Sequence, residues 1–353
     1  MARIDEFLAE VLNRKGSDLH FLAGDPPRIR LYGDLLQLRQ EKLAPEFVRE
    51  ALHEIMSKQA LERFETKDGT DFAYHLQGVA RFRVNVMRHL SGMGAVFRAI
   101  PSQALTLEQL NMPDAVRNLC RIISGLILVT GKTGSGKSTT LAAMIDDINS
   151  RIKGHILTIE DPIEFVHERR NCLISQREIG VHAPTFAAAL HSALREDPDV
   201  VLVGELRDLE TMSIAVTAAE MGILVMGTLH TNGAAATVDR MVNAFPADKQ
   251  AHVRTMLSTS LRGVVSQQLL QRADKQGRVA ALEILVNTPA VSNLIRQGKL
   301  DQLENTMQSG AQHGMRTMDT AIQALLDERV ISGREAYKKG INKSKFEAVK
   351  EIG

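Results

Sequence analysis

The sequence predicts two folded parts, a small α+β domain at residues 1–100 and a larger α/β domain at residues 113–353, joined by a linker at 101–112. In the first part, segments with helical apolar spacing occur beside segments that alternate as half-buried strands do. In the second, short strands that are apolar on both faces alternate with helical segments. That pattern is typical of a parallel sheet covered by helices on both sides.

Each element of the first part is predicted from its own periodicity. Helical spacing is found at 4–14 and 45–65. Alternation with Gly or Asp between the runs predicts strands at 27–33, 71–76, 80–90 and 94–100. Pro101 and Pro113 bound the connecting stretch that follows.

The second part is read in the same way. Apolar runs predict buried strands at 125–131, 155–161, 199–205 and 222–230. After about Glu283 the chain is expected to be mainly helical, for example over 315–330.

Composition favours a soluble, cytoplasmic protein. Lys and Arg number 43 against 42 Asp and Glu, and Trp is absent, which disfavours a nucleic-acid binder. Two cysteines, Cys120 and Cys172, exclude a four-cysteine zinc site or a disulfide framework and suggest a reducing compartment. The N-terminus lacks the apolar core of a signal peptide, and no apolar run reaches the ~18 residues of a membrane span.

The stretch "GLILVTGKTGSGKSTTLAAM" predicts a nucleotide site. Gly131, Gly136, Lys137 and Ser138 have P-loop spacing between an apolar strand and a helix-forming run. Glycines let the backbone amides surround phosphate, Lys137 reaches the β- and γ-phosphates, and the Ser138 hydroxyl ligates Mg²⁺. The other loop residues assigned to the nucleotide are Thr133, Gly134, Ser135 and Thr139. The chain is therefore predicted to bind a nucleoside triphosphate, ATP with Mg²⁺.

Hydrolysis also needs a carboxylate near the metal and one that orients water. The strand "DVVLVGE" ends in Glu205 without the expected Asp, whereas "HILTIEDPIEF" supplies Glu160, Asp161 and Glu164. If the strands are parallel, all these acids lie at one edge of the sheet. Glu205 is assigned to the metal as well as to catalysis, and which of Glu164 and Glu205 activates the water is left open.

A polar group also ends the strand "ILVMGTLH". As another parallel strand, it would place His230 and Thr231 at the same edge as the phosphates and acids. His230 is predicted to sense the γ-phosphate and to transmit its presence to the helix that follows.

These segments together resemble a known family. The P-loop, "TIEDPIEF", "ALREDPDVVLVGELRD" and "GTLHTNGAAATVDRM" occur in the order found in the secretion ATPases of type II secretion and type IV pili. The Gly-Glu strand ending is usual in that family. The resemblance implies a RecA-like P-loop ATPase domain preceded by a small PAS-like domain.

Within the family the chain is most similar to the retraction-type members. "GSDLHF", "ARFRVNV", "AVFRAIP" and "TPAVSNLIRQGKL" carry this likeness, although Val291-Ser292, Asn232 and "LNMP" depart from the usual residues. Assembly-type members are longer and have a four-cysteine motif that this chain cannot form. The resemblance implies an ATP-driven motor of type IV pilus retraction.

The resemblance further implies a homohexameric ring in which each N-terminal domain packs on the neighbouring ATPase domain. Arg83 and Arg98 would then reach the γ-phosphate of the neighbour, with Arg278 a weaker nucleotide contact within one subunit; Arg81 shares a face with Arg83. The implied partner is an inner-membrane platform protein of the pilus. The motor would bind this platform protein at the cytoplasmic face of the inner membrane. It is expected to have no transmembrane segment and to bind no nucleic acid.

Three other interpretations stay open at this point. An assembly or secretion motor of the same superfamily is disfavoured by the short N-terminus and the missing cysteine motif. A RecA-like nucleic-acid motor is disfavoured by the balanced charge. A regulatory module that binds nucleotide without turnover is the third.

Overall fold

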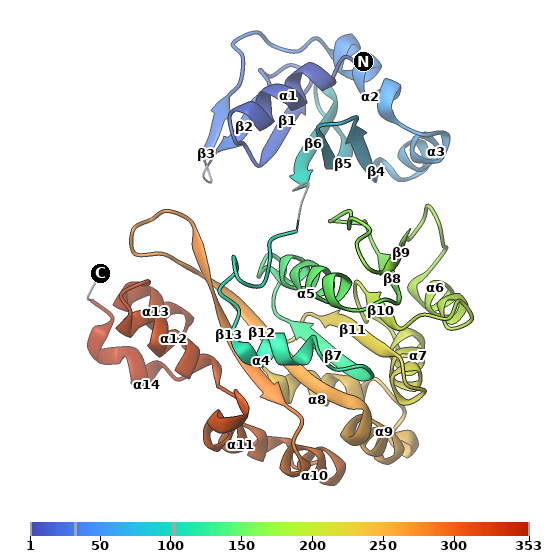
Figure 1. Cartoon of the computed structure of the whole chain (residues 1–353). Helices are drawn as coiled ribbons and strands as arrows, with labels where there is room; N and C mark the ends of the chain where they lie inside the picture. Colours follow the sequence, from blue (N-terminus) through green and yellow to red (C-terminus); the bar gives the residue numbers. More distant parts are fainter. Residues whose placement is uncertain (1, 32–33, 101–103, 352–353) are drawn as a thin grey trace. The chain divides into compact units, whose positions relative to one another are not determined.

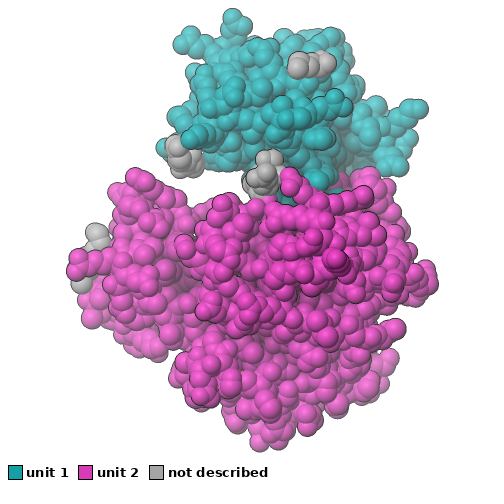
Figure 2. Space-filling model, viewed as in Figure 1, with its two compact units in different colours: residues 1–103, 162–166 teal, residues 104–161, 167–353 magenta. Residues whose placement is uncertain are grey.

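The computed structural model describes residues 2–31, 34–100 and 104–351. The chain forms two compact units, Met1–Gln103 with Pro162–Val166, and Ala104–Asp161 with His167–Gly353 (Figure 2). Residues 101–103 of the predicted linker, and Tyr32 and Gly33 of the predicted strand 27–33, lie outside the described residues. The segment 162–166 lies within the second predicted domain in sequence but groups with the first unit.

The first unit is an antiparallel sheet with helices, which agrees with the predicted α+β class. The sheet order is β3-β2-β1-β6-β5-β4 (Figure 1). Its strands are β1 (Asp18–Leu22), β2 (Arg28–Leu31), β3 (Asp34–Gln37), β4 (Gly69–Leu76), β5 (Ala80–His89) and β6 (Gly92–Ile100). Its helices are α1 (Asp5–Asn13), α2 (Pro45–Ile55) and α3 (Lys58–Lys67).

The predicted single helix at 45–65 is two helices. Met56 is extended, with ψ 130°, and the side chain of Ser57 accepts a hydrogen bond from the amide of Ala60, so a new helix begins there. Strands β1 and β3 were not predicted. All four residues of β3 are exposed, so it lacks the alternation that reveals a half-buried strand.

The second unit is a mostly parallel sheet of order β13-β12-β7-β11-β10-β8-β9, in which only β13 is antiparallel to its neighbour. Its strands are β7 (Gly125–Thr130), β8 (His155–Glu160), β9 (Leu173–Glu178), β10 (Val200–Val203), β11 (Leu224–Leu229), β12 (Leu261–Gln271) and β13 (Arg278–Val286). Strands β9, β12 and β13 were missed. The expected fold class, an α/β P-loop domain preceded by a small α+β domain, is confirmed.

Helices cover both faces of this sheet (Figure 1). They are α4 (Asp114–Leu119), α5 (Lys137–Arg151), α6 (Phe186–Ala193), α7 (Leu209–Glu220), α8 (Ala234–Asn243), α9 (Ala247–Ser260) and α10 (Pro289–Gln297). Beyond them lie α11 (Leu303–Ser309), α12 (Met318–Asp327), α13 (Gly333–Lys339) and α14 (Lys343–Phe346), as the predicted helical C-terminal part requires.

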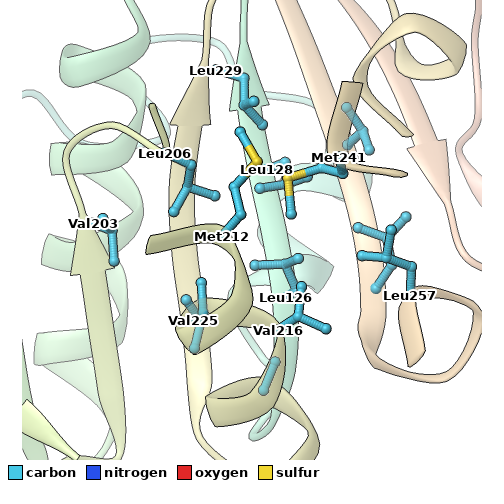
Figure 3. Packing of buried hydrophobic residues seen from close by; sticks show 14 of the residues in the cluster. Leu126, Leu128, Val203, Leu206, Met212, Val216, Val225, Leu229, Met241 and Leu257 are labelled. Carbon is cyan, nitrogen blue, oxygen red and sulfur yellow. The ribbon is translucent and has the colours of Figure 1, made fainter. Parts of the chain in front are cut away.

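Alternation along each buried strand divides the core into two layers. Leu126 and Leu128 of β7 pack with α7, α8 and α9, whereas Ile127 and Val129 pack with α4 and α5. Figure 3 shows the first layer, where Met212 of α7 and Met241 of α8 lie among the strand side chains. The strand ends are therefore held rigidly, which fixes the loops that follow them.

The segment "TPAVSNLIRQGKL" begins with the amphipathic helix α10. Val291 and Ile295, four residues apart, are buried on one face, as its apolar spacing suggested. None of the described helices is long and apolar enough to cross a membrane.

Candidate nucleotide site

The P-loop leaves the end of β7 and enters α5, as its sequence context required. Gly131, Gly134 and Gly136 have φ values of 140°, 77° and 91°, which side chains rarely adopt. A Cβ on Gly131 would overlap the backbone oxygen of Gln267 and lie 2.6 Å from Ser135 Oγ. Glycine is therefore required at this first position on steric as well as conformational grounds.

Lys137 lies folded back over the loop. Its ammonium group donates to the carbonyl oxygens of Gly131 at 2.8 Å and Lys132 at 3.2 Å, and the side chain is buried. Because an ammonium carries three donors, phosphate oxygens can share it with these carbonyls. The lysine charge is thus concentrated at the P-loop.

Two local features fit a phosphate. Helix α5 has Gly136 as its N-cap, which has no side chain to satisfy the first amides of the helix. The hydroxyl of Ser135 is buried and has no hydrogen-bond partner within the described part of the chain. A buried hydroxyl without a partner costs about 1–3 kcal/mol, so a ligand oxygen there would relieve that cost.

Glu205 and His230 are brought together, as their positions at strand ends predicted. Glu205 follows β10 and His230 follows β11, and these strands are parallel neighbours. His230 Nε2 lies 3.3 Å from Glu205 Oε1, while Arg207 Nε lies 2.7 Å from the other carboxylate oxygen. Arg207 was not predicted. It follows Glu205 by two residues, and its side chain reaches toward Asp161 as well, at 3.9 Å.

The proposed metal ligands have suitable chemistry. Ser138 offers a hydroxyl oxygen and Glu205 a carboxylate, and Mg²⁺ prefers oxygen ligands with several waters retained. A carboxylate has about four acceptor positions, so the bonds of Glu205 to His230 and Arg207 leave some for a cation. The residues fit Mg²⁺, although no cluster of three or more His, Cys, Asp or Glu side chains suited to a metal occurs among the described residues.

The other predicted acids have separate surroundings. Glu160 ends β8 and its Oε1 accepts hydrogen bonds from Thr158 at 2.7 Å and Gln176 at 3.3 Å. Glu164 lies in the segment Pro162–Val166, which belongs to the first compact unit.

The predicted arginines of the first unit lie together. Arg83 of β5 and Arg98 of β6 are cross-strand partners, so their side chains share one face. Arg98 Nε donates to Asp18 at 2.9 Å, and Arg83 Nε lies 3.9 Å from Asp71. Arg278 begins β13 in the second unit and is exposed.

Sequence reasoning missed a row of polar residues beside the P-loop. Ser266 of β12 is paired with Thr130 of β7 on one side and Glu283 of β13 on the other. The next residue, Gln267, faces the opposite side of β12, and its Oε1 accepts a 2.7 Å hydrogen bond from Thr140 of α5. The signal that could have found them is the group of three polar residues inside the apolar run "VVSQQLL".

Glu283 is a buried carboxylate in this row. It accepts hydrogen bonds from the amides of Ala234, at 2.7 Å, and Met318, at 3.1 Å. Burial raises the pKa of Glu283, and the two amide bonds oppose that rise.

Comparisons with known proteins agree with this arrangement. Residues 1–338 match the family described as Type II/IV secretion system protein. The chain is 50% identical to the Type IV pilus retractation ATPase PilT of Pseudomonas aeruginosa over 336 residues, covering 95% of this chain and 97% of the relative. It is 49% identical to a twitching motility protein of Neisseria gonorrhoeae, covering 90% of this chain and 84% of the relative.

A solved structure is similar over the whole chain. The crystal structure of the pilus retraction motor PilT with bound ADP has a TM-score of 0.91 and 41% sequence identity, covering 99% of this chain and 100% of that one. The P-loop, the Glu205–His230 pair and these matches agree with one another. The chain belongs to the type II/IV secretion system protein family, among its retraction-type ATPases.

Proposed function

We propose that this protein hydrolyses ATP in a homohexameric ring and uses the energy to retract type IV pili. Support comes from the P-loop geometry and from relatives named for pilus retraction and twitching motility that cover nearly the whole chain. A solved relative holds ADP, which supports nucleotide binding by this chain.

Binding is assigned to the P-loop. Amides of the loop and of the first turn of α5 receive phosphate oxygens, and Lys137 neutralises their charge. The assigned residues are Gly131, Thr133, Gly134, Ser135, Gly136, Lys137, Ser138 and Thr139, with Arg278 a weaker contact. Mg²⁺, held by Ser138 and Glu205, would supply charge neutralisation between the phosphates.

The contact between His230 and Glu205 is the observation that carries the proposed chemistry. A carboxylate placed beside an imidazole at the end of two parallel strands can accept a proton from the attacking water, either directly or through a second bound water. His230 orients Glu205 through Nε2 and is assigned to sense the γ-phosphate. Arg207 holds the second carboxylate oxygen and so restricts the rotation of Glu205.

Groups of the first unit complete the site in the proposed ring. Arg83 and Arg98 present two guanidinium groups on one face, which suits stabilisation of a transferring phosphoryl group of a neighbouring subunit. Glu164 is retained as the alternative group that activates water. The proposed partner is the one that the family resemblance of the sequence implies, an inner-membrane platform protein of the pilus, bound at the cytoplasmic face of the membrane.

The test is ATP turnover and nucleotide affinity of the purified protein. Lys137→Ala removes the P-loop cation and is expected to abolish ATP binding. Glu205→Gln keeps the shape of the side chain and is expected to spare affinity while lowering turnover about 10²-fold, in the range of a lost acid–base group. Glu164→Gln is measured in parallel, because wild-type turnover in either glutamine variant removes that residue from the catalytic role. A wild-type protein without turnover would contradict the proposal itself.

A further inference from the structure

The turn between His230 and α8 is held by two buried side chains from strands β12 and β13. The amide of Gly233 donates to Ser266 Oγ at 2.9 Å, and the next amide, of Ala234, donates to Glu283 Oε1 at 2.7 Å. Ser266 and Glu283 are cross-strand partners, both at most 5% exposed. Successive amides of one turn are therefore bound by one adjacent pair of residues.

The turn itself has a conformation that needs such support. Gly233 has φ 95° and ψ 155°, a region essentially restricted to glycine. A Cβ at this position would lie 3.3 Å from Glu283 Oε1, so the carboxylate also packs closely against the backbone. The pair thus fixes both the hydrogen bonding and the position of the turn.

The turn is connected to the residues that follow His230. Thr237, in the first turn of α8, donates to the carbonyl of Gly233 at 2.7 Å, and its hydroxyl lies 2.8 Å from that of Thr231. A displacement at residues 233–234 would therefore be transmitted to Thr231 and to the adjacent His230.

Glu283 also binds a distant part of the chain. Its second oxygen accepts the amide of Met318, the first residue of α12. One carboxylate consequently holds the start of α8, beside the nucleotide site, and the start of α12, in the helical C-terminal part.

We infer that Ser266 and Glu283 are positioning residues for catalysis, which hold the turn after His230 so that His230 stays in contact with Glu205. The inference rests on the proposed ATPase function. Neither residue is among those assigned to the nucleotide, so their loss should change turnover more than nucleotide affinity.

Glu283→Gln is the main variant. A glutamine has one acceptor oxygen and a donating nitrogen, so it can satisfy only one of the two amides and opposes the other. We expect the ATP turnover number to fall about tenfold, since misplacement of catalytic groups by about 1 Å can cost up to ~10²-fold. The dissociation constant for ADP should stay within about twofold, a pattern expected when only transition-state geometry is affected.

Asp319→Asn is the matched control. Asp319 is another buried carboxylate that accepts two backbone amides, those of Ile341 and Asn342, at 2.7 and 3.0 Å. Its substitution should lower the thermal transition as Glu283→Gln does and leave turnover unchanged. Hydrogen exchange adds a local measurement: the amides of Gly233 and Ala234 should exchange faster in Glu283→Gln and at the wild-type rate in Asp319→Asn.

Ser266→Ala provides a second variant that removes one small group and so avoids misfolding. It should lower turnover about fivefold, the equivalent of one hydrogen bond of about 1 kcal/mol. Wild-type turnover in Ser266→Ala, or equal losses of turnover in Glu283→Gln and Asp319→Asn, would overturn the inference. If the wild-type protein itself lacks turnover, the proposed function fails instead, so the two failures are distinguishable.

Discussion

The P-loop glycines have unequal steric surroundings, which predicts unequal costs of substitution. A Cβ on Gly131 would overlap a backbone oxygen of the buried strand β12, whereas a Cβ on Gly134 has no neighbouring atom within 4 Å. Both residues have positive φ. Gly134→Ala should therefore cost only the unfavourable backbone conformation, about 1–2 kcal/mol.

Gly131→Ala should cost more because overpacking is added. Overpacking in a well-packed region costs about 1–3 kcal/mol, so with the backbone term the total is about 2–5 kcal/mol. At about 3 °C per kcal/mol for a unit of this size, the thermal transition should fall about 6–15 °C in Gly131→Ala and about 3–6 °C in Gly134→Ala.

The assay is differential scanning calorimetry of the nucleotide-free proteins at one scan rate. Nucleotide is omitted so that only the loop conformation is compared and not the loss of a ligand contact. A fall in Gly131→Ala no larger than that in Gly134→Ala would show that β12 does not restrict the loop as the contacts indicate.

Three further outcomes follow from other residues. Leu128 is buried in β7, so Leu128→Ala should lower the free energy of unfolding by about 2–5 kcal/mol. Ile123 is exposed, so Ile123→Ala should change it by less than about 0.5 kcal/mol. Equal shifts of the two calorimetric transitions would contradict this. Burial raises the pKa of Cys120 to about 12, which lowers the fraction of thiolate at pH 8. Iodoacetamide should therefore label Cys120 about 10³-fold more slowly in the native protein than after denaturation. Equal labelling rates, measured by mass spectrometry, would contradict the burial of this thiol. The Arg98→Ala and Lys137→Ala proteins should each be inactive, but rings that contain both variants should regain ATP turnover, because an intact Arg98 of one subunit can then act on the intact P-loop of its neighbour. A mixture as inactive as its components would argue against a role of Arg98 in trans.

Features read from consecutive residues were predicted well. The P-loop and His230 each follow an apolar run directly, so a parallel sheet was enough to place them at one edge. The contact of His230 with Glu205 confirms that reasoning. The Arg83–Arg98 pairing also agrees with their placement on alternating strands.

Features made by distant residues gave no local signal. Strand β12 begins at Leu261, directly after α9 ends at Ser260, so no turn residues mark its start. Its polar residues Ser266 and Gln267 also interrupt the apolar pattern of a buried strand. Their partners lie 33 and 127 residues away, which explains why this row emerged only from the fold.

Surface piliation and twitching after deletion of the gene, with re-expression of wild-type or Lys137→Ala protein, decide whether this protein retracts pili. A retraction motor predicts cells with excess pili that cannot twitch, rescue by the wild-type protein, and no rescue by the variant that cannot bind ATP. Cells without pili would contradict the account, because they would show that this protein assembles pili and does not retract them.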